Sequence, residues 1–472
     1  MSLCLAERAL GPVAVPRQIT LEEWDEAYER AGSLEPRDAG YGGLLGRHVR
    51  SGNTRLARLQ FDNSFAALKL WNFLLTEEDR LRQARLAGKT LIGAMKDLGT
   101  VPVIACAYPD LVAFYPDGAW WLPCLLEDNA GLLAIADRLG VDESFCPVRA
   151  MLGAFVSGEH FPRPDLLVCS VGATCDDFSA IAQRVEGLGH PVLWWELPQR
   201  REPEPGEKAA LLPGGARAGA GQVAFVQAEL ARVITGFTMQ CNVKLTDRML
   251  AASIHQANKV RSCLAELRRA VFTAGLAPLP ALELLVAEML ALHYCSDRAE
   301  TLVVLEELLA TVRERTGRGV GFHGRDAVRV FWVNPVADLK AMNLLEECGG
   351  RICGTDYLFT HALDQIPDDI PPLEALARVA LADPMAGTAQ ERAQRIQRDM
   401  RAFGSEALII SRIPGASHCA LEGEVIREIV TAAGNCPVLE IEVPSVCDPL
   451  QGTLRTRLEA LVETVRNQRK ER

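Results

Sequence analysis

The sequence predicts an α/β protein with two parallel-sheet domains of the Rossmann-like (flavodoxin-like) type, linked by a helical segment and preceded by an N-terminal helical region. Two stretches, which begin at residues 89 and 321, alternate short apolar runs with helical periods. Between them a helical period continues for roughly ninety residues. The 472 residues also exceed what one hydrophobic core usually organises, so more than one domain is expected.

We expect four segments along the chain. They are an N-terminal helical cap (1–88), a first α/β domain with Cys146 and Cys175 (89–200), a linker and helical segment (201–320), and a second α/β domain with Cys419 (321–472). In the first segment, amphipathic periods predict helices over 21–32 and 63–75.

The first α/β domain begins with an apolar run at 89–94, and a second apolar run follows at 101–105. A short helix is expected to start at 108–113. The further predicted elements are a strand at 119–122, a helix at 130–139, a strand at 165–170, a helix at 178–188 and a strand at 191–195.

Residues 199–221 are rich in Pro, Gly and charge, which predicts a linker or exposed loop. Helices are expected at 223–234, 246–271, 280–294 and 298–315, with Thr246 and Asp297 as N-caps. The second α/β domain follows. Its predicted strands are 328–333, 351–353, 407–411 and 438–443, and its predicted helices are 338–348, 372–382, 389–403, 421–433 and 453–466.

Three cysteines lie in turns that lead into predicted helices. Cys146 precedes Pro147, a residue suited to the first turn of a helix. Cys175 follows the strand at 165–170, and Cys419 repeats this placement after the strand at 407–411. Because α/β sheets bind ligands at the carboxyl ends of their strands, we expect the three thiols to face a site between the domains.

Three convergent thiols suit an iron-sulfur cluster with one open iron, since thiolates are the usual ligands and helix N-termini favour negative charge. Two alternatives stay open. Buried structural cysteine is the commonest fate of a thiol, and the same thiolates with His418 form a tetrahedral zinc set, although the paired short spacings of structural zinc are missing. Three further cysteines near predicted strand ends keep a larger cluster open: Cys106, Cys353 and Cys447.

Other residues are weaker candidates for a catalytic or binding role. His418, beside Cys419, is interpreted either as a proton donor or substrate partner or as a structural residue. The acidic pairs Asp176-Asp177 and Glu346-Glu347 are interpreted as solvated or N-capping. Gly88-Lys89-Thr90 lacks the upstream glycine of a Walker loop, so any ATP chemistry must come from another protein.

The composition excludes several function classes. A net charge of −11 argues against broad attraction to nucleic acid or to an anionic membrane. No apolar run reaches the ~18 residues of a membrane helix, and the N-terminus lacks the basic region of a signal peptide. The 14 cysteines are scattered without CxxC pairs, which indicates reduced thiols. We therefore expect a cytoplasmic protein.

Several short motifs in this order resemble the 2-hydroxyacyl-CoA dehydratase and benzoyl-CoA reductase family. The similarity extends from about residue 85 to the end. The motifs are Cys146-Pro147-Val148-Arg149 with Leu152-Gly153, Asp165 to Val168, Cys175-Asp176, His418-Cys419, Cys106 to Ala113, Asn258 to Arg261, and Leu454 to Ala460.

The resemblance implies that Cys146, Cys175 and Cys419 hold a 4Fe-4S cluster, with a non-cysteine ligand or substrate oxygen at the fourth iron. It also implies a related second subunit, in a heterodimer or a homodimer, and a separate ATP-hydrolysing iron-sulfur activator. The activator would deliver one low-potential electron. That electron would convert the thioester carbonyl of an acyl-CoA substrate to a ketyl radical anion, allow loss of the adjacent hydroxyl, and then be recycled.

Departures from the family pattern define the alternatives. The segment after Cys353 and the stretch Asp383-Pro384-Met385 lack cysteines that double-cubane relatives carry, which counts against an 8-iron double-cubane reductase unless Cys353 and Cys447 substitute. A further alternative, outside the enzymes, is that the chain is a cluster-free partner that only completes a dimer. The sequence leaves open the identity of the acyl group and the choice between dehydration and ring reduction.

Overall fold

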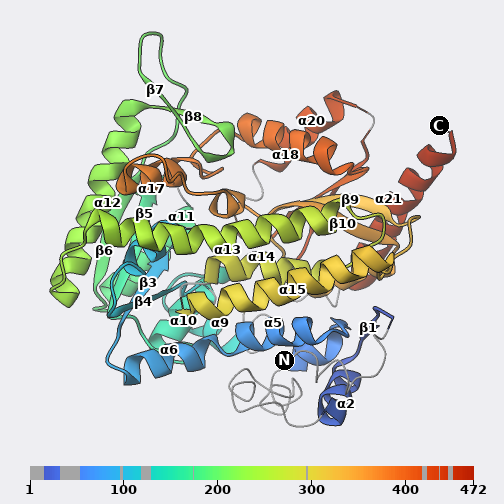
Figure 1. The fold of residues 1–472 in the computed structure, drawn as a ribbon, viewed down its shortest axis with the longest axis horizontal. Coiled ribbons are helices and arrows are strands. Elements are labelled where there is room, and N and C mark those ends of the chain that lie inside the picture. The colour runs from blue at the N-terminus through green and yellow to red at the C-terminus, as the bar shows by residue number, and fades with distance from the viewer. Residues whose placement is uncertain are drawn as a thin grey trace.

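Two four-stranded parallel sheets carry the fold of the chain in a computed structural model (Figure 1). The structure describes residues 15–31, 54–95, 99–117, 129–173, 175–293, 296–416, 422–434, 436–444 and 450–471. Each sheet is flanked by helices, and four further helices lie between the two sheets in the sequence. This architecture confirms the predicted class of two Rossmann-like domains with a helical segment.

The first sheet has the strand order β4-β3-β5-β6, and all neighbouring strands are parallel. β3 and most of β5 are buried because helices lie over both faces, which explains their continuous apolar sequences. The strands are β3 (Thr90–Met95), β4 (Leu111–Phe114), β5 (Leu166–Gly172) and β6 (Val192–Leu197). The helices are α7 (Val101–Ala105), α9 (Asn129–Arg138), the 3₁₀ turn η2 (Pro147–Arg149), α10 (Ala150–Ser157) and α11 (Asp176–Gly187).

The second sheet has the order β10-β9-β11-β12, again fully parallel. Its strands are β9 (Val328–Val333), β10 (Gly350–Asp356), β11 (Ala407–Arg412) and β12 (Val438–Glu442). Its helices are α16 (Lys340–Glu347), η5 (Thr360–Leu363), α17 (Pro372–Leu381), α18 (Ala389–Phe403), α20 (Gly423–Ala432) and α21 (Gln451–Glu471).

Both sheets have the flavodoxin-like order, in which the first strand in sequence lies between the second and the third. In this topology the ligand crevice opens at the carboxyl ends of the first and third strands. The turn after β5 and the turn after β11 therefore occupy equivalent positions in the two domains.

The helical segment joins the two sheets. It contains α12 (Ala220–Cys241), α13 (Asp247–Thr273), α14 (Ala281–His293) and α15 (Arg298–Arg318). Figure 1 shows α13 crossing the molecule from the first sheet toward the second. The Ser253 hydroxyl of α13 donates to the carbonyl of Val103 at 2.7 Å, and Arg268 further along donates to the carbonyl of Thr355 at 3.2 Å. One helix therefore contacts both domains.

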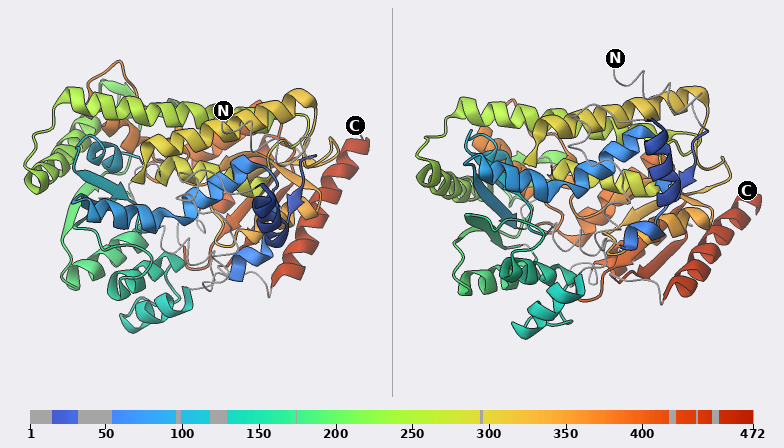
Figure 2. Two further views of the ribbon diagram at one scale, coloured as in Figure 1. Left: turned by 60° about the horizontal axis from the view of Figure 1, so that its bottom comes forward. Right: turned by 90° about the horizontal axis from the view of Figure 1, so that it is seen from below.

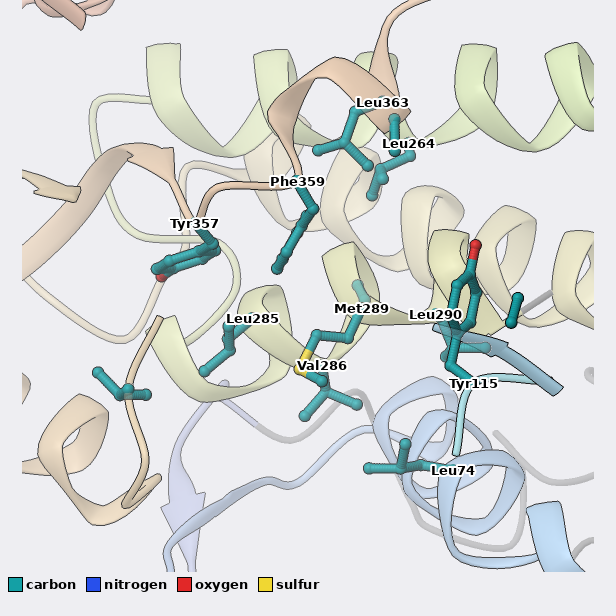
Figure 3. Packing of buried hydrophobic residues seen from close by; sticks show 14 of the residues in the cluster. Leu74, Tyr115, Leu264, Leu285, Val286, Met289, Leu290, Tyr357, Phe359 and Leu363 are labelled. Carbon is teal, nitrogen blue, oxygen red and sulfur yellow. The ribbon is translucent and has the colours of Figure 1, made fainter. Parts of the chain in front are cut away.

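Helix α14 forms a buried centre between the domains. Figure 3 shows its side chains packed with Tyr115, which follows β4, and with Tyr357 and Phe359, which follow β10. Leu74 of the N-terminal region and Leu264 of α13 belong to the same hydrophobic cluster. The carboxyl-end loops of both sheets thus share one core with the helical segment.

The N-terminal region lies along the outside of the helical segment (Figure 2). It contains β1 (Gln18–Ile19), α2 (Leu21–Ala31), η1 (Thr54–Arg58), β2 (Phe61–Asp62), α5 (Phe65–Leu75) and α6 (Glu77–Leu86). β1 and β2 pair antiparallel. Ser64 caps α5 by accepting the N–H of Ala67. Within the described ranges, none of the helices combines the length and apolar character that crossing a bilayer requires.

One predicted helix differs from the structure, and one predicted strand cannot be compared with it. The helix expected to start at 108–113 is wrong, because residues 111–114 form β4 and pair in register with β3 from Thr90↔Leu111 to Gly93↔Phe114. Pairing with a neighbouring strand outweighs the local pattern in so short a run. The intervening apolar run, Val101–Ala105, forms α7. The strand predicted at 119–122 lies outside the described residues.

The expected linker at 199–221 is more ordered than its composition indicates. It forms a small hairpin of β7 (Ala209–Leu211) and β8 (Arg217–Gly219) around the 3₁₀ turn η3 (Pro213–Gly215). Arg200 is buried, and its guanidinium donates to the Leu381 carbonyl at 2.5 Å and pairs with Glu391 at 3.1 Å. These contacts attach the segment to the second domain.

A buried polar cluster attaches the N-terminal region to the helical segment. Arg315 of α15 makes a bidentate pair with Asp62, at 2.6 and 2.7 Å. Glu283 of α14 accepts the backbone N–H of Asp62 at 2.9 Å and the indole N–H of Trp71 at 3.2 Å. Burial, reinforced by the charge of Asp62, raises the pKa of Glu283 to about 8.

Replacing Arg315 by methionine should destabilise the protein by about 3–5 kcal/mol, because the Asp62 carboxylate then stays buried without its cation. Urea unfolding measures the loss. The matched control on the same helix is Arg318→Met, whose partner Glu314 is exposed, with an expected change within about 1 kcal/mol. Equal effects of the two substitutions would contradict the buried pair.

Glu283 should make stability fall with rising pH. The pKa of Glu283 in the folded protein lies above the ordinary value. Its contribution to the free energy of unfolding is therefore complete below about pH 4.3 and is lost as the pH rises through about 8. We expect the free energy of unfolding of the wild type to fall more between pH 6 and 9 than that of Glu283→Gln, which keeps both accepted hydrogen bonds. Parallel slopes in urea titrations of the two proteins would contradict this.

Candidate metal centre

Cys146 lies in the turn between α9 and η2. It is the N-cap of η2, with Pro147 as the first residue of that turn of helix, and α10 continues directly from it. The side chain is buried, with 9% of the residue exposed. The predicted placement of Cys146 at a helix start is confirmed.

Cys175 lies at the carboxyl end of β5, where it is the N-cap of α11. Its side chain makes no capping hydrogen bond, so the thiol is not used to satisfy the helix N-terminus. The residue is half-buried. The predicted position in a strand-to-helix turn is also confirmed, and it lies at the crevice of the first sheet.

Asp177 lies near both of these cysteines. Its carboxylate faces the thiol of Cys175, which donates at 3.9 Å, and the backbone of Cys146 is close enough to influence its pKa. Only 7% of Asp177 is exposed. Burial raises the pKa of Asp177 above the ordinary value; the nearby backbone N–H of Cys146 opposes this rise, and the charge of neighbouring Asp176 reinforces it. The structure therefore brings Cys146 and Cys175 to one carboxylate.

The interpretation of the Asp176-Asp177 pair as solvated or N-capping holds for one residue only. Asp176 is exposed in the first turn of α11, whereas Asp177 is buried against Cys146. The difference arises because the turn at 142–146, distant in sequence, packs onto this side of the helix. The only feature of the sequence that could have suggested the burial of Asp177 was its position two residues after Cys175, a candidate metal ligand.

The turn after β11 lies directly on Cys146. Gly415 has a φ of 80°, and a Cβ on it would overlap the carbonyl of Phe145 and press on the backbone nitrogen of Cys146. Only glycine tolerates both the conformation and the close approach. The chain continues from this turn to His418 and Cys419, which both lie outside the described residues.

The chain after His418 and Cys419 is anchored to the second sheet. Glu422 pairs with Arg392 of α18 at 2.6 Å. Arg392 is almost fully buried and also bonds Asp356 at 3.2 Å and Asn334 at 2.8 Å, at the ends of β10 and β9. Burial by itself would raise the pKa of Asp356, but Arg392 and Arg395 bring it below the ordinary value. This network holds the start of α20 at the crevice of the second sheet.

The Asn258 and Arg261 motif of α13 clamps the loops of both domains. Asn258 donates to the carbonyl of Ile366 at 2.8 Å and accepts its N–H at 2.9 Å. Arg261 donates to the carbonyl of Asp364 at 2.7 Å and to that of Gly99 at 3.1 Å. Gly99 follows β3 and residues 364–366 follow β10, so the motif sets the spacing between the carboxyl ends of the two sheets.

Two of the further candidate cysteines lie in the core. Burial raises the pKa of the Cys106 thiol to about 11, and it also raises the pKa of Cys353, which is 0% exposed within β10. A raised thiol pKa disfavours the thiolate form that binds metal. Cys447 lies outside the described residues.

The described residues include two of the three thiols that the resemblance implies as cluster ligands, Cys146 and Cys175. Among the described residues no three His, Cys, Asp or Glu side chains gather as metal ligands. Cys146 and Cys175 lie near one carboxylate, that of Asp177, and the turn that leads to Cys419 lies against Cys146. Thiols at helix starts are favourable positions for anionic iron-sulfur ligation.

One family model matches most of the chain. The family model for 2-hydroxyglutaryl-CoA dehydratase, D-component, matches residues 109–465, which is well over half of the chain and includes Cys146, Cys175 and Cys419. No protein of curated function matches the chain significantly.

Replacing Gly415 by alanine should destabilise the protein by about 2–3 kcal/mol, since the new Cβ combines backbone strain with overlap at Phe145. The matched control is Gly319→Ala, which has a φ of 65° but open space around its Cβ, with an expected loss of about 1 kcal/mol. Denaturant unfolding compares them. Equal losses would show that the turn does not press on the Cys146 loop.

Proposed function

Because this chain belongs to the 2-hydroxyglutaryl-CoA dehydratase D-component family, we propose that it is the iron-sulfur subunit of an ATP-dependent enzyme that removes water from a 2-hydroxyacyl-CoA. The observation that carries the proposal is that Cys146 and Cys175 lie at helix starts near the Asp177 carboxylate, and that the turn toward Cys419 lies against Cys146. Family membership supports a dehydratase-type component. The cluster, the radical chemistry and the partners are the proposed part.

Cys146, Cys175 and Cys419 would hold one 4Fe-4S cluster. The cluster would supply a single electron at low potential to the thioester carbonyl, which would let the adjacent hydroxyl leave as hydroxide and the neighbouring carbon lose a proton before the electron returns. The chain's own residues hold the ligands and the loops around them. The Asn258 and Arg261 clamp keeps the two sheets at a constant spacing, and the α14 core fills the space between their loops.

Two proteins would work with this chain. A separate ATP-hydrolysing iron-sulfur activator would supply the electron, because the sequence carries no Walker loop. A related subunit would complete the dimer. His418 would be a proton donor or a hydrogen-bond partner of the substrate, given its place beside Cys419.

The second domain supports a single cluster over a double cubane. Its turn between α17 and α18 corresponds in topology to the turn that carries Cys146. It contains Asp383-Pro384-Met385 instead of a cysteine, and Asp383 and Met385 are buried. The equivalent of Cys175 is Cys419. The two domains would therefore contribute two thiols and one thiol, which suits one cluster with an open iron.

Anaerobically purified protein should contain about four irons and four sulfides per chain, and Cys146→Ala, Cys175→Ala and Cys419→Ala should each lose most of them. Iron and sulfide analysis with electron paramagnetic resonance of the reduced protein measures this. The control is Cys241→Ala, at the far end of α12, which should keep its iron.

Iron near eight per chain would favour the double cubane, and folded protein without iron would leave only a cluster-free partner. With activator and ATP, dehydration yields an enoyl-CoA and consumes no net reductant. Ring reduction consumes reductant in proportion to product, so the reductant balance separates the dehydratase from a reductase.

A further inference from the structure

Arg149 lies in the turn that carries Cys146, and its side chain is buried there. It is the last residue of η2, and only 8% of the residue is exposed. Its Nη1–H donates to the carbonyl of Phe145 at 3.2 Å, and its Nε lies 3.5 Å from the carboxylate of Asp137 on α9. One side chain therefore joins the end of α9 to the residue that precedes Cys146.

The Phe145 carbonyl is the atom through which Arg149 holds this turn. Backbone bonds shape the turn itself, since the Phe145 N–H donates to the Asp142 carbonyl at 3.1 Å and the Arg149 N–H donates to the Cys146 carbonyl at 3.0 Å. The Gly415 turn of the second domain packs against the same Phe145 carbonyl. A shift of Phe145 would therefore disturb both Cys146 and the contact between the domains.

The positive charge of Arg149 is only partly compensated. Removing a guanidinium from water is costly unless carboxylates and other acceptors surround it. Among the described residues, Asp137 is the one carboxylate at ion-pair distance from Arg149, and half of its side chain is exposed. Asp142 lies close enough for the charge of Arg149 to lower its pKa, but it is exposed. Within the same part of the chain, the Nε–H of Arg149 has no hydrogen-bond acceptor. The Cys146 turn thus contains a buried cation that can still interact with an anion.

We propose that Arg149 is a positioning residue of the metal centre, which holds the Cys146 turn through Phe145 and offsets the negative charge of a bound cluster. This inference rests on the proposed cluster-bearing function. Thiolate ligation makes an iron-sulfur centre anionic, and reduction adds a further negative charge. A buried cation beside a ligand turn stabilises the reduced centre more than the oxidised one, because water screens the interaction weakly there. Arg149 therefore raises the reduction potential of the cluster.

The test compares three variants at this position in the full chain: Arg149→Met, which removes donor and charge, Arg149→Gln, which keeps a donor, and Arg149→Lys, which keeps both. In the metal-free protein, hydrogen exchange of the Phe145 amide should accelerate about tenfold in Arg149→Met. It should stay within about threefold of the wild type in the other two. The matched control is Arg138→Met, at the exposed end of α9 beside Asp137, which should exchange like the wild type.

The same proteins are then loaded with ferrous iron and sulfide, and the reduction potential is measured by a redox titration followed by electron paramagnetic resonance. Arg149→Met should load at least about fivefold more slowly than the wild type. The potentials of Arg149→Met and Arg149→Gln should both be more negative than that of the wild type, whereas Arg149→Lys and Arg138→Met should stay close to it. A wild-type potential in loaded Arg149→Met would overturn the inference, as would unchanged amide exchange in the metal-free variant.

The failure of each idea has its own signature. Wild-type protein that binds no iron overturns the proposed function, and the role of Arg149 at the cluster with it. Iron-loaded wild type with equal potentials in Arg149→Gln and Arg149→Lys overturns the inference alone, because a purely structural role does not distinguish the two. If Arg149→Met does not fold, this comparison decides, since both remaining variants keep a donor for the Phe145 carbonyl.

Discussion

The site depends on the spacing that α13 imposes between the carboxyl ends of two parallel sheets. Each sheet alone presents only half of a crevice, and the loops that build the halves are far apart in sequence. Arg261 donates from one planar guanidinium to a loop of each domain, and Asn258 binds one of the same loops through both of its amide atoms. Rigid donors of this kind determine the relative position of two domains more precisely than apolar packing does. The buried α14 core then supplies most of the cohesion between them.

Cys146 is one of the places where loops of the two domains contact each other. Within its own domain it lies near the Asp177 carboxylate, and from the other domain the Gly415 turn lies against its backbone. Cys106 and Cys353 have a different environment, in which burial in the core raises the pKa of the thiol. The contrast separates thiols that serve as packing from thiols placed at helix starts beside a crevice. Because the two sheets have the same strand order, Cys175 and Cys419 occupy corresponding positions in sequence, each after the third strand of its domain. The turn that corresponds to the Cys146 turn contains Asp383 and no cysteine, so the second domain has one candidate thiol fewer.

Most helices and strands of the second domain could be predicted because each has a strong local signal, although the strand predicted at 351–353 covers only part of β10. The strand at 328–333 and the helix at 389–403 end where the apolar pattern ends, and Thr388 and Glu391 form a capping box at the start of that helix. The segment at 111–114 could not be predicted in this way, since four apolar residues suit a helix or a strand and only pairing with β3 decides. Arg200 was equally hidden, because its burial depends on a turn nearly two hundred positions later in the chain.

The sequence by itself determined the repeated alternation of strands and helices, the turns that carry Cys146 and Cys175, and the family motifs, because these features depend on neighbouring residues. The tertiary structure alone decided that Asp177 is buried while Asp176 is exposed, that Gly415 lies on the Cys146 turn, and that Arg392 anchors Glu422 beside Asn334 and Asp356. Each of these contacts joins segments that are distant along the chain. Local propensity carries no information about such contacts, because the burial of a polar side chain is set by whatever packs against it after the sheets have come together.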